Sequence, residues 1–265
     1  LSILQQLQAG ELTSEFRLSQ QKTPIVKLQI AEGLTEFPKE ILALADSLEV
    51  LDLSNNHLSE LPSELDTLVN MRILFLTNND FEHIPAVLAR CPKLEMISFK
   101  SNRLTTIGED VLPVNTRWLI LTDNAIQLLP ESMGKLKRLQ KLALAGNCLQ
   151  ALPASMAACH NLELVRLSAN QLPSVPDWLF QLPKLAWLAF SGNEFNRASN
   201  ESSAEKLSTE NNTRADAVVD VSLDQILLGE LLGQGASGLI YRGDWIKKPQ
   251  TLSARDDHIA VKIFK

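Results

Sequence analysis

Apolar residues recur along the chain with a fixed spacing, and each copy of the pattern holds a short alternating stretch that ends at an asparagine. The stretch "LEVLDLSNNHLSELP" from Leu48 returns as "MRILFLTNNDFEHIP" from Met71 and as "LEMISFKSNRLTTIG" from Leu94. Within a copy, apolar residues such as Leu51 and Leu53 alternate with positions of the other face, as in a short strand with one buried side. Further copies begin at Thr116, Leu139, Leu162 and Leu185.

The asparagines that end these stretches lie 23, 23, 22, 23, 23 and 23 residues apart. A degenerate earlier copy begins at Val26 and has Gly33 where the asparagine would be. Turns of this length cannot bury their own apolar residues, so we expect them to stack into a solenoid whose strands form a parallel sheet. We expect each asparagine amide to pair with buried backbone groups. The residues concerned are Asn56, Asn79, Asn102, Asn124, Asn147, Asn170 and Asn193.

Residues 23–196, which carry these copies, resemble leucine-rich repeats, and the "LP" of most copies resembles the variants with a short, irregular outer side. The resemblance implies an α/β solenoid with a parallel sheet on its concave face. Strand positions that point away from the core lie on that face, and large apolar side chains there indicate a surface for a protein partner or substrate. We prefer Phe75 and Trp118 as its anchors. The candidate surface residues are Ile73, Phe75, Met96, Trp118, Ile120 and Trp187.

The segments that flank the repeats differ from them in composition. Residues 1–22 have apolar side chains at Leu1, Leu4 and Leu7, which predicts a short helix that caps the first turn. An alternative is that this segment folds over the concave face and hides the apolar surface. Residues 197–217 are polar and contain a single leucine, which is typical of a flexible linker.

Residues 218–265 contain the glycine-rich stretch "LLGQGASGLIYRGDW", in which the glycines are Gly233, Gly235 and Gly238. A G-x-G-x-x-G pattern alone is weak, because two nucleotide-binding architectures use it. Here the residues after the third glycine alternate like a strand, which indicates a hairpin instead of a strand followed by a helix. The stretch "HIAVKIFK" then supplies Ala260 and Lys262 in a V-A-I-K arrangement.

This combination resembles the first three strands of a eukaryotic-type protein kinase. The resemblance implies an incomplete β-rich kinase N-lobe, whose glycine-rich backbone covers the phosphates of ATP and whose Lys262 contacts the α- and β-phosphates. It implies ATP, with Mg²⁺ in a complete kinase, as the cofactor, whereas the repeats require none. The residues matched to ATP binding are Leu232, Gly233, Gln234, Gly235, Ala236, Ser237, Gly238, Ile240, Ala260 and Lys262.

The catalytic aspartate and the metal-binding residues of a kinase do not occur before Lys265. We therefore expect this chain to be an N-terminal fragment that is catalytically inactive by itself. The layout resembles bacterial proteins in which leucine-rich repeats run into a eukaryotic-like kinase domain that phosphorylates serine, threonine or tyrosine. The main alternative is a non-catalytic leucine-rich-repeat scaffold that binds proteins. A weaker one is an effector in which the repeats deliver another catalytic domain.

Composition restricts the remaining possibilities. The net charge is −6, and we find no basic stripe of the kind that binds nucleic acid. The three cysteines lack metal-ligand spacing, which argues against a zinc site or a disulfide framework. The chain shows neither a membrane-spanning run nor a signal peptide at its start, so we expect a cytoplasmic protein. The sequence does not indicate an oligomeric state.

Overall fold

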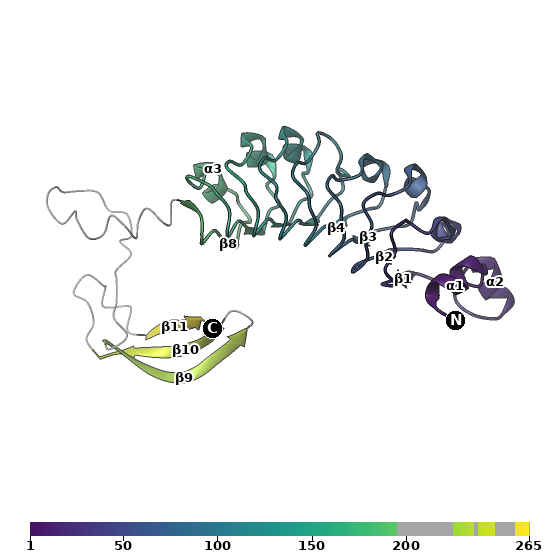
Figure 1. Cartoon of the computed structure of the whole chain (residues 1–265). Helices are drawn as coiled ribbons and strands as arrows, with labels where there is room; N and C mark the ends of the chain where they lie inside the picture. Colours follow the sequence, from purple (N-terminus) through teal and green to yellow (C-terminus); the bar gives the residue numbers. More distant parts are fainter. Residues whose placement is uncertain (195–224, 236–237, 247–257, 265) are drawn as a thin grey trace. The chain divides into compact units, whose positions relative to one another are not determined.

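The computed structural model describes residues 1–194, 225–235, 238–246 and 258–264. The chain divides into two compact units, Leu1–Leu207 and Ser208–Lys265, which are described separately. The first unit contains the repeats and the second contains a three-stranded sheet (Figure 1). The expected linker, residues 197–217, lies outside the described residues.

The repeats form one sheet of eight parallel strands, in which each strand pairs with the next one along the chain. The register places equivalent repeat positions opposite one another, so Leu51 pairs with Leu74 and Leu74 pairs with Ile97. The degenerate first copy contributes a strand as well, so the expected parallel sheet is confirmed. The strands are β1 (Lys27–Gln29), β2 (Val50–Asp52), β3 (Ile73–Phe75), β4 (Met96–Ser98), β5 (Trp118–Ile120), β6 (Lys141–Ala143), β7 (Leu164–Arg166) and β8 (Trp187–Ala189).

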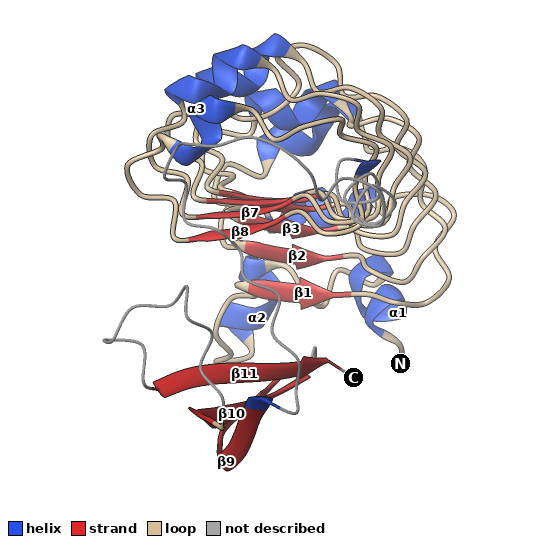
Figure 2. Cartoon of the chain, turned by 90° about the vertical axis from the view of Figure 1, so that its left-hand side faces the viewer, coloured by secondary structure: helices blue, strands red, loops and turns tan. Residues whose placement is uncertain are grey.

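Short helical turns lie on the side of the solenoid opposite the sheet (Figure 2). Proline precedes each of them, since its fixed φ suits the start of a helical turn and its missing N–H is not needed there. This arrangement leaves the strands on the inner side of the arc formed by the first unit (Figure 1). The turns are the 3-10 helices η1 (Lys39–Leu44), η2 (Ser63–Thr67), η3 (Ala86–Arg90), η4 (Glu131–Lys135) and η5 (Ala154–Ala158), and the α-helix α3 (Asp177–Phe180).

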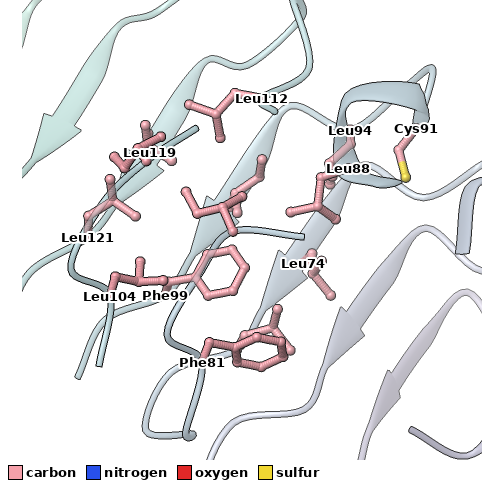
Figure 3. Close-up of a cluster of buried hydrophobic side chains, with 14 of the residues drawn as sticks. Leu74, Phe81, Leu88, Cys91, Leu94, Phe99, Leu104, Leu112, Leu119 and Leu121 are labelled. Carbon is pink, nitrogen blue, oxygen red and sulfur yellow. The ribbon is translucent and has the colours of Figure 1, made fainter. Parts of the chain in front are cut away.

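The hydrophobic core runs between the sheet and the helical turns as one continuous cluster. The central residue of each inner strand is a leucine, isoleucine or valine and is buried, as Leu74 and Leu119 illustrate. Figure 3 shows these side chains together with Phe81 and Phe99, whose rings meet edge to face with centroids 5.2 Å apart. Because every turn contributes its apolar residues to the same cluster, each turn is stabilised by its neighbours.

The asparagine ladder forms as the sequence predicts. The side-chain nitrogen of Asn147 donates to the carbonyl of Leu144 in its own turn and to that of Leu121 in the preceding turn, at 3.0 and 2.9 Å. Its Oδ1 accepts the backbone N–H of Ile126 at 3.0 Å. The next asparagine, Asn170, repeats the pattern and also donates to Leu144. Each amide therefore connects two successive turns.

The residue directly before each asparagine has a positive φ, which the repeat pattern does not predict. This position requires the left-handed conformation that turns the chain out of the strand, and only glycine and, less well, asparagine or aspartate adopt it cheaply. Ser101 and Ala169, both with φ of 54°, are therefore the strained members of the series. The residues are Asn55, Asn78, Ser101, Asp123, Ala169, Gly146 and Gly192.

The N-terminal segment forms two short helices, α1 (Ile3–Gln8) and α2 (Ser14–Ser19), where we expected one. Gly10, with φ of 73°, and the Thr13 N-cap separate them, because a left-handed residue ends one helix and a hydroxyl cap begins the next. The segment meets the first turn of the solenoid, where the Ser14 hydroxyl lies 2.9 Å from a carboxylate oxygen of Asp46. It caps that end of the core with Leu7.

The second unit is an antiparallel sheet in the order β11–β10–β9, composed of β9 (Ile226–Gly235), β10 (Gly238–Trp245) and β11 (His258–Phe264). The hairpin expected at the glycine-rich stretch is present between β9 and β10. Gly243 is buried, and a Cβ there would lie 2.8 Å from side-chain atoms of both Ile259 and Val261. At this position of β10, only glycine leaves room for these two apolar side chains of β11.

Candidate functional site

The sheet register brings five of the six candidate surface residues together on three neighbouring strands. Ile73, Met96 and Trp118 are opposite one another on β3, β4 and β5. Phe75 and Ile120 flank Ser98 in the next row of the same strands. All five apolar side chains are half-buried. We call this group, Ile73, Phe75, Met96, Trp118 and Ile120, the apolar patch.

The sixth candidate, Trp187, lies apart from the apolar patch. It sits on β8 and pairs with Leu164, so two strands, β6 and β7, separate it from Trp118. Its side chain is the most exposed of the six, with 56% of its surface accessible. The structure therefore divides the predicted surface into a central patch and a separate tryptophan near the last turn.

A cleft of about 190 Å³ opens at one edge of the apolar patch, between Ile73, Met96 and Trp118. Its polar wall consists of Glu95 and Arg117, which each precede a strand by one residue. The carboxylate of Glu95 pairs with the guanidinium groups of Arg72 and Arg117 from the turns on either side. Arg72 also lies 3.9 Å from a carboxylate oxygen of Glu49, so the two arginines and two glutamates balance in charge. The cleft therefore favours an apolar group with a polar rim.

A lysine closes the other end of the apolar patch. Lys141 follows Trp118 in register, and its ammonium nitrogen lies 3.8 Å from the centroid of the Trp118 ring. This cation–π contact holds the ammonium group on the concave face instead of in bulk water. The next strand places the exposed Arg166 in the neighbouring row, opposite Ala143.

The residues matched to ATP binding belong to the second unit. Gly233 pairs with Ile240 on β10, and Ile240 pairs with Lys262 on β11, so the glycine-rich hairpin and the lysine occupy adjacent rungs of the sheet backbone. Leu232 is exposed. Ala236 and Ser237 lie outside the described residues, as do the side chains of Gln234, Ile240, Ala260 and Lys262; Gly233, Gly235 and Gly238 are described by their backbone alone.

Another hollow lies beside the asparagine turns. It has a volume of about 620 Å³ and is lined by residues that include His57, Asp80 and Arg103. The Asp80 carboxylate pairs with the Arg103 guanidinium at 2.8 Å and lies 3.3 Å from the His57 ring. Since these groups pair with one another and lie in open solvent, the hollow offers little to a charged ligand.

Two kinds of site are missing from the described ranges. No group of three or more histidine, cysteine or carboxylate side chains there could hold a metal ion. Within the same ranges, no helix has the length and apolar character needed to cross a membrane.

Two family models match the repeats. Residues 46–86 match the model described as "Leucine Rich repeats (2 copies)", and residues 111–210 match "Leucine-rich repeat and WD repeat-containing protein 1, LRR". The two ranges contain six of the eight strands of the sheet, β2, β3 and β5 to β8. Residues 27–189 form a leucine-rich-repeat solenoid.

Relatives of the repeats occur within longer and varied proteins. A mouse leucine-rich repeat and calponin homology domain-containing protein 1 is 32% identical over 115 residues, which is 42% of this chain and 16% of the relative. The rice plant intracellular Ras-group-related LRR protein 7 is 48% identical over 64 residues, or 24% of each chain. The chain thus spans at most about a quarter of these relatives' length.

Two solved structures resemble the solenoid. A Leptospira interrogans LRR protein superimposes with a TM-score of 0.53 at 27% identity, over 61% of this chain and 47% of that one. An internalin from Listeria monocytogenes superimposes with a TM-score of 0.52 over 63% of this chain and 48% of that one. The second likeness, at 19% identity, concerns the fold alone.

The charged groups around the apolar patch were missed as functional candidates. The sequence places Glu95 and Arg117 one position before their strands, which in hindsight marks them as neighbours of the cleft. Lys141 occupies a concave position, but its contact with Trp118 depends on two strands lying side by side. A search of concave positions in equivalent turns for unpaired charges would have found it.

Proposed function

We propose that the repeats are a protein-binding scaffold and that the apolar patch on the concave face is the surface that contacts the partner. The observation that carries this proposal is the gathering of five large apolar side chains, half-buried and still accessible, on three adjacent strands. Sheets of soluble proteins rarely leave such a patch on a solvent side without an interaction to serve.

The chain is similar to leucine-rich-repeat regions of otherwise different proteins, which supports a role of the repeats in recognition rather than in one particular reaction. The N-terminal segment leaves the surface available, because its helices meet the first turn near Asp46 and not the strands β3 to β5. The alternative that this segment hides the patch is therefore not favoured.

Photo-crosslinking tests the proposal without removing any packing side chain. A photoreactive amino acid at Ala143, which lies beside Ile120 on the concave face, should crosslink the partner in cells that express the protein. The matched control is the same amino acid at Ala154, an exposed residue at the start of a helical turn on the other side. Crosslinks from the second position and none from the first would refute the proposal.

A protein kinase is the second candidate function, and one observation favours it. The backbone register of β9, β10 and β11 aligns Gly233, Ile240 and Lys262 across three strands, as the resemblance to a kinase N-lobe requires. In a kinase of this kind, the glycine-rich hairpin covers the phosphates of ATP. The adenine is surrounded by Leu232, Ile240 and Ala260, and the repeats select the protein that is phosphorylated. The family models that match the repeats do not extend beyond residue 210.

Phosphate transfer in the full-length protein tests this second candidate. ATP-dependent phosphorylation of a protein substrate should disappear in Lys262→Met, because the lysine positions the α- and β-phosphates. Lys247→Met, a change of the same kind outside the V-A-I-K arrangement, is the control. Activity that survives Lys262→Met would contradict the role of this lysine.

A further inference from the structure

The concave face carries positive charge that no carboxylate of the described residues neutralises, although the chain as a whole has a net charge of −6. Lys141 and Arg166 occupy concave positions on β6 and β7, and Lys100 follows β4. Within the described residues, none of these three forms a salt bridge with a carboxylate, whereas Arg72 and Arg117 at the strand edge both pair with Glu95. The unpaired cations therefore belong to the open face and the paired ones to its edge.

Acidic side chains are scarce on the same face. On the strands β3 to β8, the positions that point away from the core include no aspartate or glutamate. Asp52 on β2 is the acidic residue at such a position, and its carboxylate already accepts the backbone N–H of Ser54 at 3.0 Å. A partner that lies along the strands therefore meets Lys141 and Arg166 without an acidic side chain on β3 to β8, whereas Glu95 and the exposed Glu163 lie at the edge of the face, one residue before their strands.

The positive groups lie next to the apolar patch. Lys141 is in contact with the Trp118 ring, and Arg166 lies one strand further. Adjacent strands are about 4.8 Å apart and Arg166 lies one row along from Lys141, so the step from the cleft between Met96 and Trp118 to Lys141 and Arg166 spans about 7–14 Å. An extended polypeptide covers that distance in about two to four residues, at about 3.3 Å per residue.

We propose that the concave face recognises an extended polypeptide segment in which an apolar side chain is followed or preceded, two to four residues away, by an aspartate or glutamate. The apolar side chain occupies the cleft beside Trp118, and the carboxylate pairs with Lys141 and Arg166. This inference rests on the proposed protein-binding function and adds the chemistry of the partner. Charge complementarity carries it, because a carboxylate supplies what the two cations lack.

Selection from a displayed library of random ten-residue peptides tests the partner's chemistry on the complete chain. The wild-type protein should enrich peptides with a large apolar residue two to four positions from an acidic one. The variant Lys141→Glu/Arg166→Glu should enrich basic residues at that spacing instead. The control Lys93→Glu/Lys137→Glu has the same net charge and changes exposed lysines away from the concave face, so it should select the wild-type peptides.

Individual peptides then give the size of the effect. A selected acidic peptide should lose at least about tenfold in affinity on the Lys141→Glu/Arg166→Glu variant, and its lysine counterpart should gain, since reversing close charge pairs removes their coupling. Equal affinities for the acidic and lysine peptides, or no enrichment by the wild-type chain, would overturn the inference. Tight binding of oligo(dT) in competition with the peptide would overturn it as well, because the face would then bind anions generally.

The two proposals fail in different ways. Crosslinks from Ala143 to a partner whose contact segment is basic or uncharged leave the scaffold function intact and refute the acidic segment. If Ala143 forms no crosslinks, the scaffold function itself is refuted.

Discussion

Removing one asparagine of the ladder should destabilise the whole solenoid, and Asn147→Ala is the sharpest case. Asn147 is 6% exposed, and its amide makes three hydrogen bonds to the backbone. The carbonyls of Leu121 and Leu144 each keep a second donor, Asn124 and Asn170, when this side chain is removed. The N–H of Ile126 loses the one acceptor found for it among the described residues.

The magnitude follows from this unequal loss. A buried N–H without a partner costs about 1–3 kcal/mol, whereas a carbonyl that keeps one of two hydrogen bonds costs less. We therefore expect Asn147→Ala to lower the free energy of unfolding by about 2–3 kcal/mol. Urea unfolding followed by circular dichroism measures this change as a lower midpoint.

The matched control is Asn161→Ala on the helical-turn side. Asn161 also donates to a backbone carbonyl, that of Lys137 at 2.8 Å, and its Oδ1 accepts from the Lys184 ammonium group at 2.7 Å, but both bonds are solvent-exposed. Water replaces these bonds, so the loss should stay below about 0.5 kcal/mol. Similar losses for the two variants would refute the reasoning, because burial of the orphaned N–H would then contribute nothing.

Three further predictions concern other turns. Ala169→Gly should stabilise the solenoid by about 0.5–1 kcal/mol in urea unfolding, because glycine adopts the left-handed conformation without the Cβ clash; a loss of stability would contradict it. Burial opposes ionisation of the Glu95 carboxyl, but its hydrogen bond to Arg72 and the charges of Arg72 and Arg117 lower its pKa. The stability that Glu95 adds is thus present above its unfolded pKa of about 4.3, and it is lost as the pH falls through the lower pKa of the folded state. Glu95→Gln should therefore flatten the acid side of a plot of melting temperature against pH, and an unchanged plot would rule this out. Burial raises the pKa of the Cys91 thiol from 9.0 to about 11, so between these pH values the thiol ionises in the unfolded chain and not in the folded one. The free energy of unfolding should therefore decline over this range in the wild-type protein, and Cys91→Ala should remove that decline. A decline that persists in full in the variant would contradict this role of Cys91.

The candidate surface illustrates how far periodicity reaches. Counting positions from each asparagine assigned Ile73, Met96 and Trp118 to one row of the concave face, and the register confirms that row. The same count could not show that Trp187 is more exposed than the residues of the apolar patch, because the exposure of a side chain depends on the turns that lie beside it. For the glycine-rich stretch, the hairpin is confirmed, whereas ATP binding by Lys262 stays a prediction.

The sequence by itself determined the solenoid, since a spacing of 22 or 23 residues, a buried strand leucine and an asparagine at each turn admit one way of stacking. It also indicated which face is open. Only the tertiary structure decided which charges neutralise one another and which remain available, as Glu95 between two arginines and Lys141 over Trp118 show. Such pairs join residues 22 or 23 positions apart, and their side chains meet only after neighbouring turns have stacked. No local sequence pattern encodes the direction in which a long side chain then points.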